Sequence, residues 1–204
     1  HADSYDQLVD SPWLLGNPKL SAFSINGILH RMAYIGDTDW WDLKNITQDV
    51  KTVTQTIADF WGTLPYERYT YLNVIAQGRG GLEHLNSTLM LSDRWASKDR
   101  KSYLDWLGLV SHEFFHTWNG KRLRPHNLGP FDYENETYTK SLWVVEGLTS
   151  YYDDLLLHRS GLTTRKEYLS HLSKSIKQLQ ATPGRLKHAL DMTSFDAWTK
   201  YYQQ

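Results

Sequence analysis

The segment HEFFH at residues 112–116 offers the side chains of a metal-dependent hydrolase. On a helix, positions i and i+4 lie on one face, so the imidazoles of His112 and His116 can bind a single ion. Glu113 directly follows the first histidine, where its carboxylate can reach a water molecule on that ion. Two neutral nitrogen ligands, a base and an open coordination position are what a catalytic zinc site requires. The segment therefore predicts a zinc hydrolase centre on a helix.

A catalytic zinc site needs a third protein ligand, and the sequence offers several candidates. One class of zinc hydrolase extends the motif to HExxHxxGxxH, but Asn119 and Arg122 occupy the positions that would complete it. A second class takes a glutamate from a following helix, and Glu146 in the segment WVVEG fits that arrangement. Burying such a carboxylate among apolar residues is costly unless a cation awaits it. Weaker candidates lie in the preceding loop, which positions ligands less rigidly: Glu134, Glu136 and His126.

The helices that must position these residues follow from the spacing of apolar side chains. Leucine and valine at intervals of three and four predict a helix from near Ser102 to about Asn119, which carries the motif. A second helix is predicted over 142–158, after a long loop, and carries Glu146. Three further helices are predicted from their start signals, which lie at Asp39, Thr164 and Ser194.

The strands are predicted before the motif, where β-branched and aromatic residues are frequent. Their predicted ranges are 23–35, with a break at Gly27, 69–76 and 85–91. A glycine-rich stretch between the last two predicts a turn, formed by Gly78, Gly80 and Gly81. A small sheet followed by helices places the chain in the α+β class.

The composition bounds the class of protein. With 204 residues, 40% of them hydrophobic and 22% charged, the chain has the make-up of a folded soluble protein. A net charge of −1 argues against electrostatic binding to nucleic acid, and no apolar run reaches the roughly 20 residues of a membrane span. The absence of cysteine excludes thiolate ligands and leaves cytoplasm and periplasm both open. The chain begins at His1 without methionine, so we expect a piece of a longer protein.

Three segments together resemble one family of zinc peptidases. SHEFFHTWNGKRLRP from Ser111, LWVVEGLTSYY from Leu142 and GGLEHLNS from Gly80 are similar to the glycyl aminopeptidase family of gluzincin metallopeptidases. In full-length members the resemblance implies a β-rich domain before the catalytic domain and a PDZ-like domain after it, and we expect neither within this sequence. It implies a thermolysin-like catalytic domain over the whole chain, made of two lobes: a sheet-containing lobe at about 1–100 and a helical lobe at about 101–204.

The resemblance also assigns roles to single residues. It implies one zinc ion per chain, held by His112, His116 and Glu146, with Glu113 as general base. Glu83 would bind the free α-amino group of a peptide, while the adjoining strand edge pairs with the peptide backbone. The stretch GGLEH matches the part of related aminopeptidases that holds the substrate, which implies substrate-binding roles for Gly81, Glu83 and His84.

Two features depart from the family pattern. His84 stands where the broader aminopeptidase pattern often has asparagine. In related enzymes a tyrosine donates a hydrogen bond to the oxyanion, and we expect it in a Tyr-x-Lys-Gly segment beyond Gln204. Tyr151, Tyr201 and Tyr202 are available but do not match that pattern. We therefore expect low activity from this chain alone.

The sequence thus predicts zinc-dependent hydrolysis of peptide bonds by an aminopeptidase that acts on peptide N-termini. An endopeptidase of the same fold is the alternative among enzymes. A non-catalytic peptide-binding or chaperone-like module that keeps the metal is the alternative outside them, although a structural zinc site would need a fourth protein ligand. The expected partner is a peptide substrate, without nucleic acid or membrane insertion, and the oligomeric state stays open.

Overall fold

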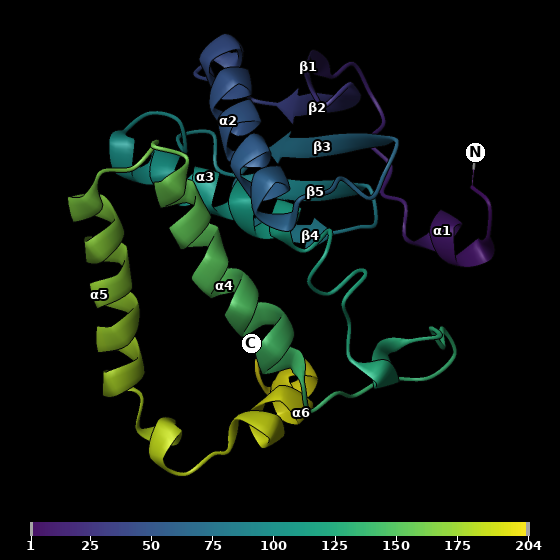
Figure 1. Ribbon diagram of the computed structural model, residues 1–204, viewed down its shortest axis with the longest axis vertical. Coiled ribbons are helices and arrows are strands. Elements are labelled where there is room, and N and C mark those ends of the chain that lie inside the picture. The colour runs from purple at the N-terminus through teal and green to yellow at the C-terminus, as the bar shows by residue number, and fades with distance from the viewer. Residues whose placement is uncertain (1, 203–204) are drawn as a thin grey trace.

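The computed structural model describes residues 2–202 and centres on a five-stranded sheet (Figure 1). The strands are β1 (Lys19–Ile25), β2 (Ile28–Gly36), β3 (Arg68–Ile75), β4 (Gly80–Glu83) and β5 (Ser87–Ser92). They lie in the order β1-β2-β3-β5-β4. The outer pairs β1–β2 and β4–β5 are antiparallel, while β2–β3 and β3–β5 are parallel. The sheet is therefore mixed, and β4 forms one of its edges.

β1 and β2 form a hairpin whose two-residue turn is Asn26-Gly27. Both turn residues have positive φ, 51° for Asn26 and 79° for Gly27. Two-residue hairpins favour this conformation because it matches the twist of the flanking strands, and asparagine and glycine tolerate it best. The strand predicted over 23–35 is thus broken at the expected glycine, Gly27, and the two pieces pair as a hairpin.

β4 stands where a glycine turn is predicted, and β5 corresponds to the predicted third strand. Gly80 and Gly81 lie inside β4 rather than in a turn. β5 covers most of the strand predicted over 85–91, and β3 agrees with the strand predicted over 69–76. Glycine weakens strands and often marks a close approach of another group, so the pairing of β4 depends on contacts that the local sequence does not show.

Two helices pack on one face of the sheet, α2 (Leu43–Trp61) and α3 (Arg100–Phe115). Alternate residues of β3 point into the core beneath them, among them Tyr69 and Tyr71. α2 ends at Gly62, whose φ of 73° closes the helix in the left-handed conformation, close to the predicted end. Its buried stripe recurs every three or four residues and consists of Ile46, Val50, Val53 and Ile57.

The second half of the chain adds three longer helices, α4 (Leu142–Arg159), α5 (Arg165–Ala181) and α6 (Leu190–Lys200). α4 packs along α3, and α6 lies against the first turn of α4 (Figure 1). α5 begins at the predicted capping box, in which Thr164 and Glu167 each bond the other's backbone N–H. Ser194 was predicted as a helix cap, but it lies inside α6. There its hydroxyl accepts a hydrogen bond from the N–H of Trp143 at 3.0 Å.

The helix that carries the HExxH segment is shorter than predicted. It begins at Arg100, capped by the Asp99 side chain, and ends at Phe115 with His116 as the capping residue. The remaining helical elements are short: α1 (Tyr5–Val9), η1 (His126–Leu128) and η2 (Pro183–Leu186). None of the helices within residues 2–202 combines the length and apolar character needed to cross a lipid bilayer. A mixed sheet followed by helices confirms the predicted α+β class.

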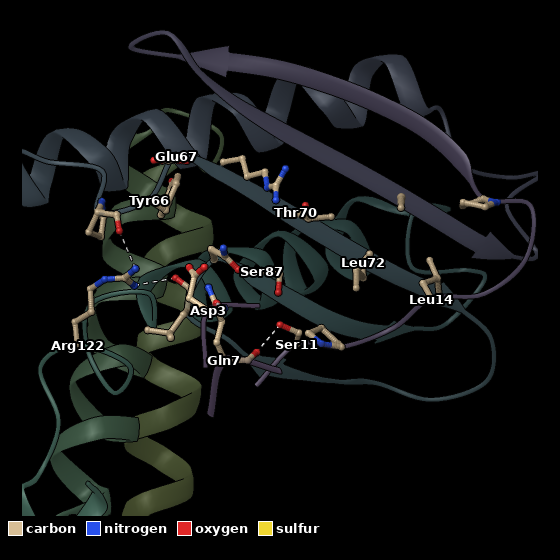
Figure 2. Close-up of a pocket in the computed structure, with 17 residues that line it drawn as sticks. Asp3, Gln7, Ser11, Leu14, Tyr66, Glu67, Thr70, Leu72, Ser87 and Arg122 are labelled. Atoms are coloured by element: carbon tan, nitrogen blue, oxygen red, sulfur yellow. Dashed lines mark hydrogen bonds between the residues drawn. The ribbon is translucent and has the colours of Figure 1, made fainter. Parts of the chain in front are cut away.

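The other face of the sheet lies against the N-terminal segment. Figure 2 shows side chains of that segment, including Gln7 and Leu14, opposite Thr70 and Leu72 of β3. Between them lies a pocket of about 610 Å³. The residues predicted to bind metal or substrate do not line this pocket.

Candidate metal centre

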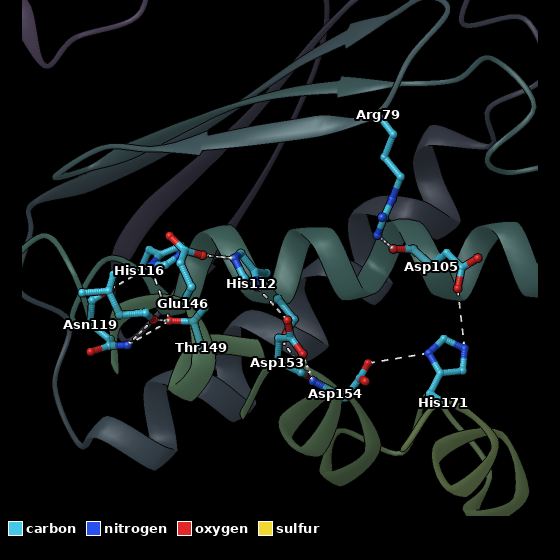
Figure 3. A network of polar contacts seen from close by, with 12 residues as sticks. Arg79, Asp105, His112, His116, Asn119, Glu146, Thr149, Asp153, Asp154 and His171 are labelled. Carbon is cyan, nitrogen blue, oxygen red and sulfur yellow. Dashed lines mark hydrogen bonds and ion pairs between the residues drawn. The ribbon is translucent and has the colours of Figure 1, made fainter. Parts of the chain in front are cut away.

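The C-terminal end of α3 and the second turn of α4 bring His112, His116 and Glu146 together (Figure 3). The Nε2 atoms of the two histidines lie 3.0 Å apart. Glu146 Oε2 lies 3.4 Å from Nε2 of His112 and 3.6 Å from Nε2 of His116. All three ligand atoms lie within 4.8 Å of one another. The i, i+4 histidine pair and the helix glutamate thus form one cluster.

Contacts of the second ring nitrogen fix how each imidazole is turned. Nδ1 of His112 lies 2.8 Å from Oδ2 of Asp153, and Nδ1 of His116 lies 2.8 Å from the carbonyl oxygen of Asn119. Both partners are acceptors and require a proton on Nδ1, so Nε2 of each neutral ring carries a lone pair. Two lone pairs and a carboxylate oxygen therefore converge on one point, an arrangement that a shared cation satisfies.

This donor set fits a catalytic zinc ion. Two imidazole nitrogens and one carboxylate oxygen leave a fourth position open, as in catalytic rather than structural zinc sites. Burial lowers the pKa of His112, but its hydrogen bonds to Asp153 and Glu146 outweigh burial and raise it to about 10. Burial raises the pKa of Glu146, but hydrogen bonds from the two histidines outweigh it and lower the pKa to about 2. The surroundings favour positive charge where the three side chains meet.

A buried amide holds the two halves of the cluster in place. The side chain of Asn119, in the turn after α3, donates hydrogen bonds to the carbonyl of Val145 at 2.8 Å and to the hydroxyl of Thr149 at 2.9 Å. Both acceptors lie on α4, on either side of Glu146. The amide therefore connects the end of the histidine helix to the helix that carries the glutamate.

Glu113 lies beside the cluster and is almost fully buried, with 4% of its surface exposed. Its Oε2 atom has no hydrogen-bond partner among the described residues. Burial raises the pKa of Glu113 to about 7, which is close to the range in which a general base works best at neutral pH. A buried and unpartnered carboxylate oxygen is costly in a purely structural role, so the geometry favours a functional one.

β4 passes directly over Glu113. A methyl group at Gly81 would lie 2.2 Å from Oε1 of Glu113, so only glycine allows this approach. Glu83, at the other end of β4, is half-buried. After burial, the charge of Glu83 is a further cause of the raised pKa of Glu113, so the two carboxylates interact electrostatically.

His84 faces the N-terminal segment. It is 8% exposed, and its Nδ1 lies 3.5 Å from Oδ1 of Asp10. Asp10 also accepts a hydrogen bond from the backbone N–H of Leu85 at 2.9 Å. His84 thus helps to attach the N-terminal segment to the end of β4, and its predicted contact with substrate stays a prediction.

The weaker candidates for the third ligand lie elsewhere. Glu134 and Glu136 lie in an exposed loop, and Glu136 accepts a hydrogen bond from the hydroxyl of Tyr138. His126 is exposed in η1. Within residues 2–202, the group of side chains that could hold a metal ion contains none of these three.

Asp153 was not predicted at the site, and Tyr202 was named only among the available tyrosines. Asp153 orients His112 and lies seven residues after Glu146 on α4. That spacing puts both carboxylates on one helix face and is the signal that could have indicated Asp153. Burial and then the charge of Glu146 raise the pKa of Tyr202 to about 12. The electrostatic influence of Glu146 on Tyr202 depends on the packing of α6 against α4, which residue spacing does not reveal.

A groove of about 470 Å³ opens beside His112 and Glu113. Its lining residues follow α3 back to Asp105 and include Arg79 and His171 of α5, whose side chains lie on opposite sides of Asp105 in Figure 3. The groove is large enough to take part of a peptide, and it places such a ligand within reach of the cluster.

The chain is similar to known peptidases in sequence and in structure. Residues 105–204 match the profile of the M61 glycyl aminopeptidases. An aminopeptidase N family protein from Idiomarina loihiensis has a similar structure over 100% of this chain and 36% of its own, with a TM-score of 0.95 and 38% identity. An M1 zinc metallopeptidase from Deinococcus radiodurans matches over 89% of this chain and 36% of its own, with a TM-score of 0.52 and 16% identity. The latter likeness shows the fold alone.

The chain spans about a third of the length of these two solved structures, 36% in each case. Comparison with curated proteins gave no match.

Proposed function

The chain belongs to the M61 glycyl aminopeptidase family, and we propose that it forms a zinc-dependent catalytic domain that removes residues from peptide N-termini. The domain consists of the sheet-containing half at about 1–100 and the helical half at about 101–204. One observation carries the proposal: His112, His116 and Glu146 converge beside the buried, unpartnered carboxylate of Glu113.

His112, His116 and Glu146 would hold one zinc ion per chain. When bound, the ion would polarise the scissile carbonyl and lower the pKa of a coordinated water to about 7. Asp153 and Asn119 keep the two imidazoles turned toward that ion through their contacts with Nδ1. Such partners of the ligands raise metal affinity because they fix the ring orientation.

Glu113 acts as the general base. Its carboxylate accepts a proton from the attacking water and then delivers that proton to the nitrogen of the leaving amine. Burial raises the pKa of this group to about 7, so Glu113 can both accept and release a proton near neutral pH. The close approach of Gly81 leaves little space for solvent on that side of the carboxylate.

Glu83 and β4 bind the amino-terminal residue of the substrate. The carboxylate of Glu83 anchors the α-ammonium group. Within residues 2–202 the outer edge of β4 has no strand partner, so its backbone can pair with an extended peptide. Gly81 allows that peptide to come close to Glu113, and His84 holds the end of β4 against Asp10.

Hydrolysis of a free and an N-acetylated peptide of the same sequence tests this proposal. We expect acetylation to lower kcat/KM by about 10- to 100-fold, since a hydrogen-bonded charge contributes roughly 1.5–3 kcal/mol. Glu83→Ala should cause a similar loss for the free peptide and little change for the acetylated one. Glu67→Ala, at an exposed glutamate that lines the pocket on the other sheet face, is the matched control.

Equal cleavage of both peptides would identify an endopeptidase. If neither peptide is cleaved at full zinc occupancy, the domain is a binding module rather than an enzyme.

A further inference from the structure

The groove beside the metal centre is continuous with a second pocket. The groove of about 470 Å³ and the adjoining pocket of about 240 Å³ share three lining residues, Arg79, Asp105 and Leu109. Leu109 lies one helical turn before Glu113 on α3, and Arg79 directly precedes β4. A ligand that enters at the metal centre and follows β4 backward therefore reaches Arg79.

Apart from Glu113 at the metal centre, the acidic side chains of this groove already have partners. Asp105 is paired with Lys101 and with His171, at 3.2 and 3.5 Å. Asp154 lies 3.8 Å from the other nitrogen of His171. Asp153 is bonded to His112.

Two cations of the groove, Arg79 and Lys174, differ from these acids in their contacts. Arg79 donates one hydrogen bond, at 3.2 Å, to the backbone carbonyl of Asp105. Among the described residues it forms no ion pair, and neither does Lys174, which lines the same groove from α5. Away from Glu113, the charge in the groove that lacks an ion-pair partner among the described residues is therefore positive.

The separation between Arg79 and the metal centre corresponds to the length of a short peptide. Arg79 bonds the backbone carbonyl of Asp105, so the helix rise between Asp105 and His112 approximates this separation. The two residues are seven positions apart on α3, or about 10 Å along the helix. Two residues beyond a scissile bond extend about 7 Å, and a guanidinium–carboxylate contact adds about 3 Å. A peptide whose first residue is held at Glu83 would therefore present the carboxylate of its third residue to Arg79.

The second pocket suits the end of such a peptide. Its apolar wall includes Trp95 and Leu109. Ser92 and Trp106 also line it, and both are buried, with 2% of their surface exposed. The hydroxyl of Ser92 and the indole N–H of Trp106 have no hydrogen-bond partner among the described residues. The pocket thus combines an apolar wall with unused donors near a free guanidinium.

We propose that Arg79, together with Lys174, binds the α-carboxylate of a short peptide, so that the domain is selective for tripeptides with a free C-terminus. This inference rests on the proposed aminopeptidase function. Arginine suits the role because its planar guanidinium can bind a carboxylate through two parallel hydrogen bonds. Glu83 would hold one end of the tripeptide and Arg79 the other, with the first peptide bond at the metal centre.

Binding measured by calorimetry tests the proposal without turnover. Zinc-loaded Glu113→Gln protein is titrated with trialanine, with trialanine amide and with Ala-Ala-Asp-amide, which carries its carboxylate on a side chain. Trialanine should bind at least about tenfold more tightly than either amide. The further substitution Arg79→Gln should lower the affinity for trialanine to that for trialanine amide, and it should leave the affinity for the amide unchanged. Arg31→Gln, at an exposed arginine on β2, is the control and should change nothing.

Three results would overturn the assignment. Equal binding of trialanine and its amide would remove the carboxylate site. If Arg79→Gln lowers the affinities for trialanine and for trialanine amide equally, Arg79 has a structural role. Ala-Ala-Asp-amide binding as tightly as trialanine would assign Arg79 to a side-chain carboxylate instead. If the acid is preferred but the protein with Glu113 intact hydrolyses no peptide, the carboxylate site stands and the proposed function fails.

Discussion

Each metal-binding imidazole depends on a second residue that the HExxH pattern does not contain. Asp153 accepts from His112 at Nδ1, and the carbonyl of Asn119 accepts from His116 at Nδ1. Because these acceptors select the tautomer, they leave both Nε2 lone pairs free for one ion. The pattern identifies the ligands, but these contacts determine where the ligands point.

Removing the orienting carboxylate should therefore weaken the metal site. We expect Asp153→Ala to lower zinc affinity by about 10- to 100-fold, measured by competition with a chromogenic chelator. Asp154→Ala is the matched control, because the neighbouring carboxylate contacts His171 rather than His112. Equal affinities in the two variants would show that Asp153 does not orient the ligand.

At the scale of elements, the helices could be predicted more fully than the strands. The stripes of α2 and α3 and the capping box at Thr164 are local signals, since they lie within one element. β4 could not be predicted, because two glycines read as a turn and its pairing with β5 depends on the packing over Glu113. Tyr202 was named among the available tyrosines, but the effect of Glu146 on its pKa could not be predicted, because it depends on how α6 packs against α4.

The close contact between β4 and α3 gives a test at this scale. In Gly81→Ala the new methyl group would lie 2.2 Å from Oε1 of Glu113, so the carboxylate or the strand must shift. We expect kcat/KM to fall by about 100-fold, since a misplacement of about 1 Å can cost that much, while zinc content stays unchanged. Gly80→Ala is the matched control, because no atom lies within 4 Å of its added methyl group. Similar activities in both variants would contradict a close fit between β4 and Glu113.

At the scale of the whole molecule, the core contains a histidine that takes no part in the site. His30 on β2 is fully buried, with Nε2 2.9 Å from the hydroxyl of Tyr66 and Nδ1 3.1 Å from the carbonyl of Ile28. Burial lowers its pKa from 6.5 to about 4. Between these values the unfolded chain binds a proton that the native protein does not, so the free energy of unfolding decreases as the pH falls.

We therefore expect stability to decrease between pH 6.5 and 4, by about 3 kcal/mol from this group. Urea unfolding of the metal-free protein across that range measures the loss. His30→Gln should remove this part of the pH dependence, because glutamine does not titrate, while other groups contribute equally to both proteins. A difference between the two proteins that stays constant with pH would exclude His30 as the cause.

The metal centre lies where the sheet half meets the helical half, so its chemistry depends on the fold of both. In the proposed mechanism three side chains hold zinc while Glu113 moves the proton. The most direct measurement is zinc content together with peptide hydrolysis in the unmodified protein, Glu113→Gln and Glu146→Gln. We expect one zinc per chain and a loss of hydrolysis of about 10²- to 10⁴-fold in Glu113→Gln, but loss of zinc in Glu146→Gln. Loss of zinc from Glu113→Gln, or unchanged hydrolysis by it, would contradict the account.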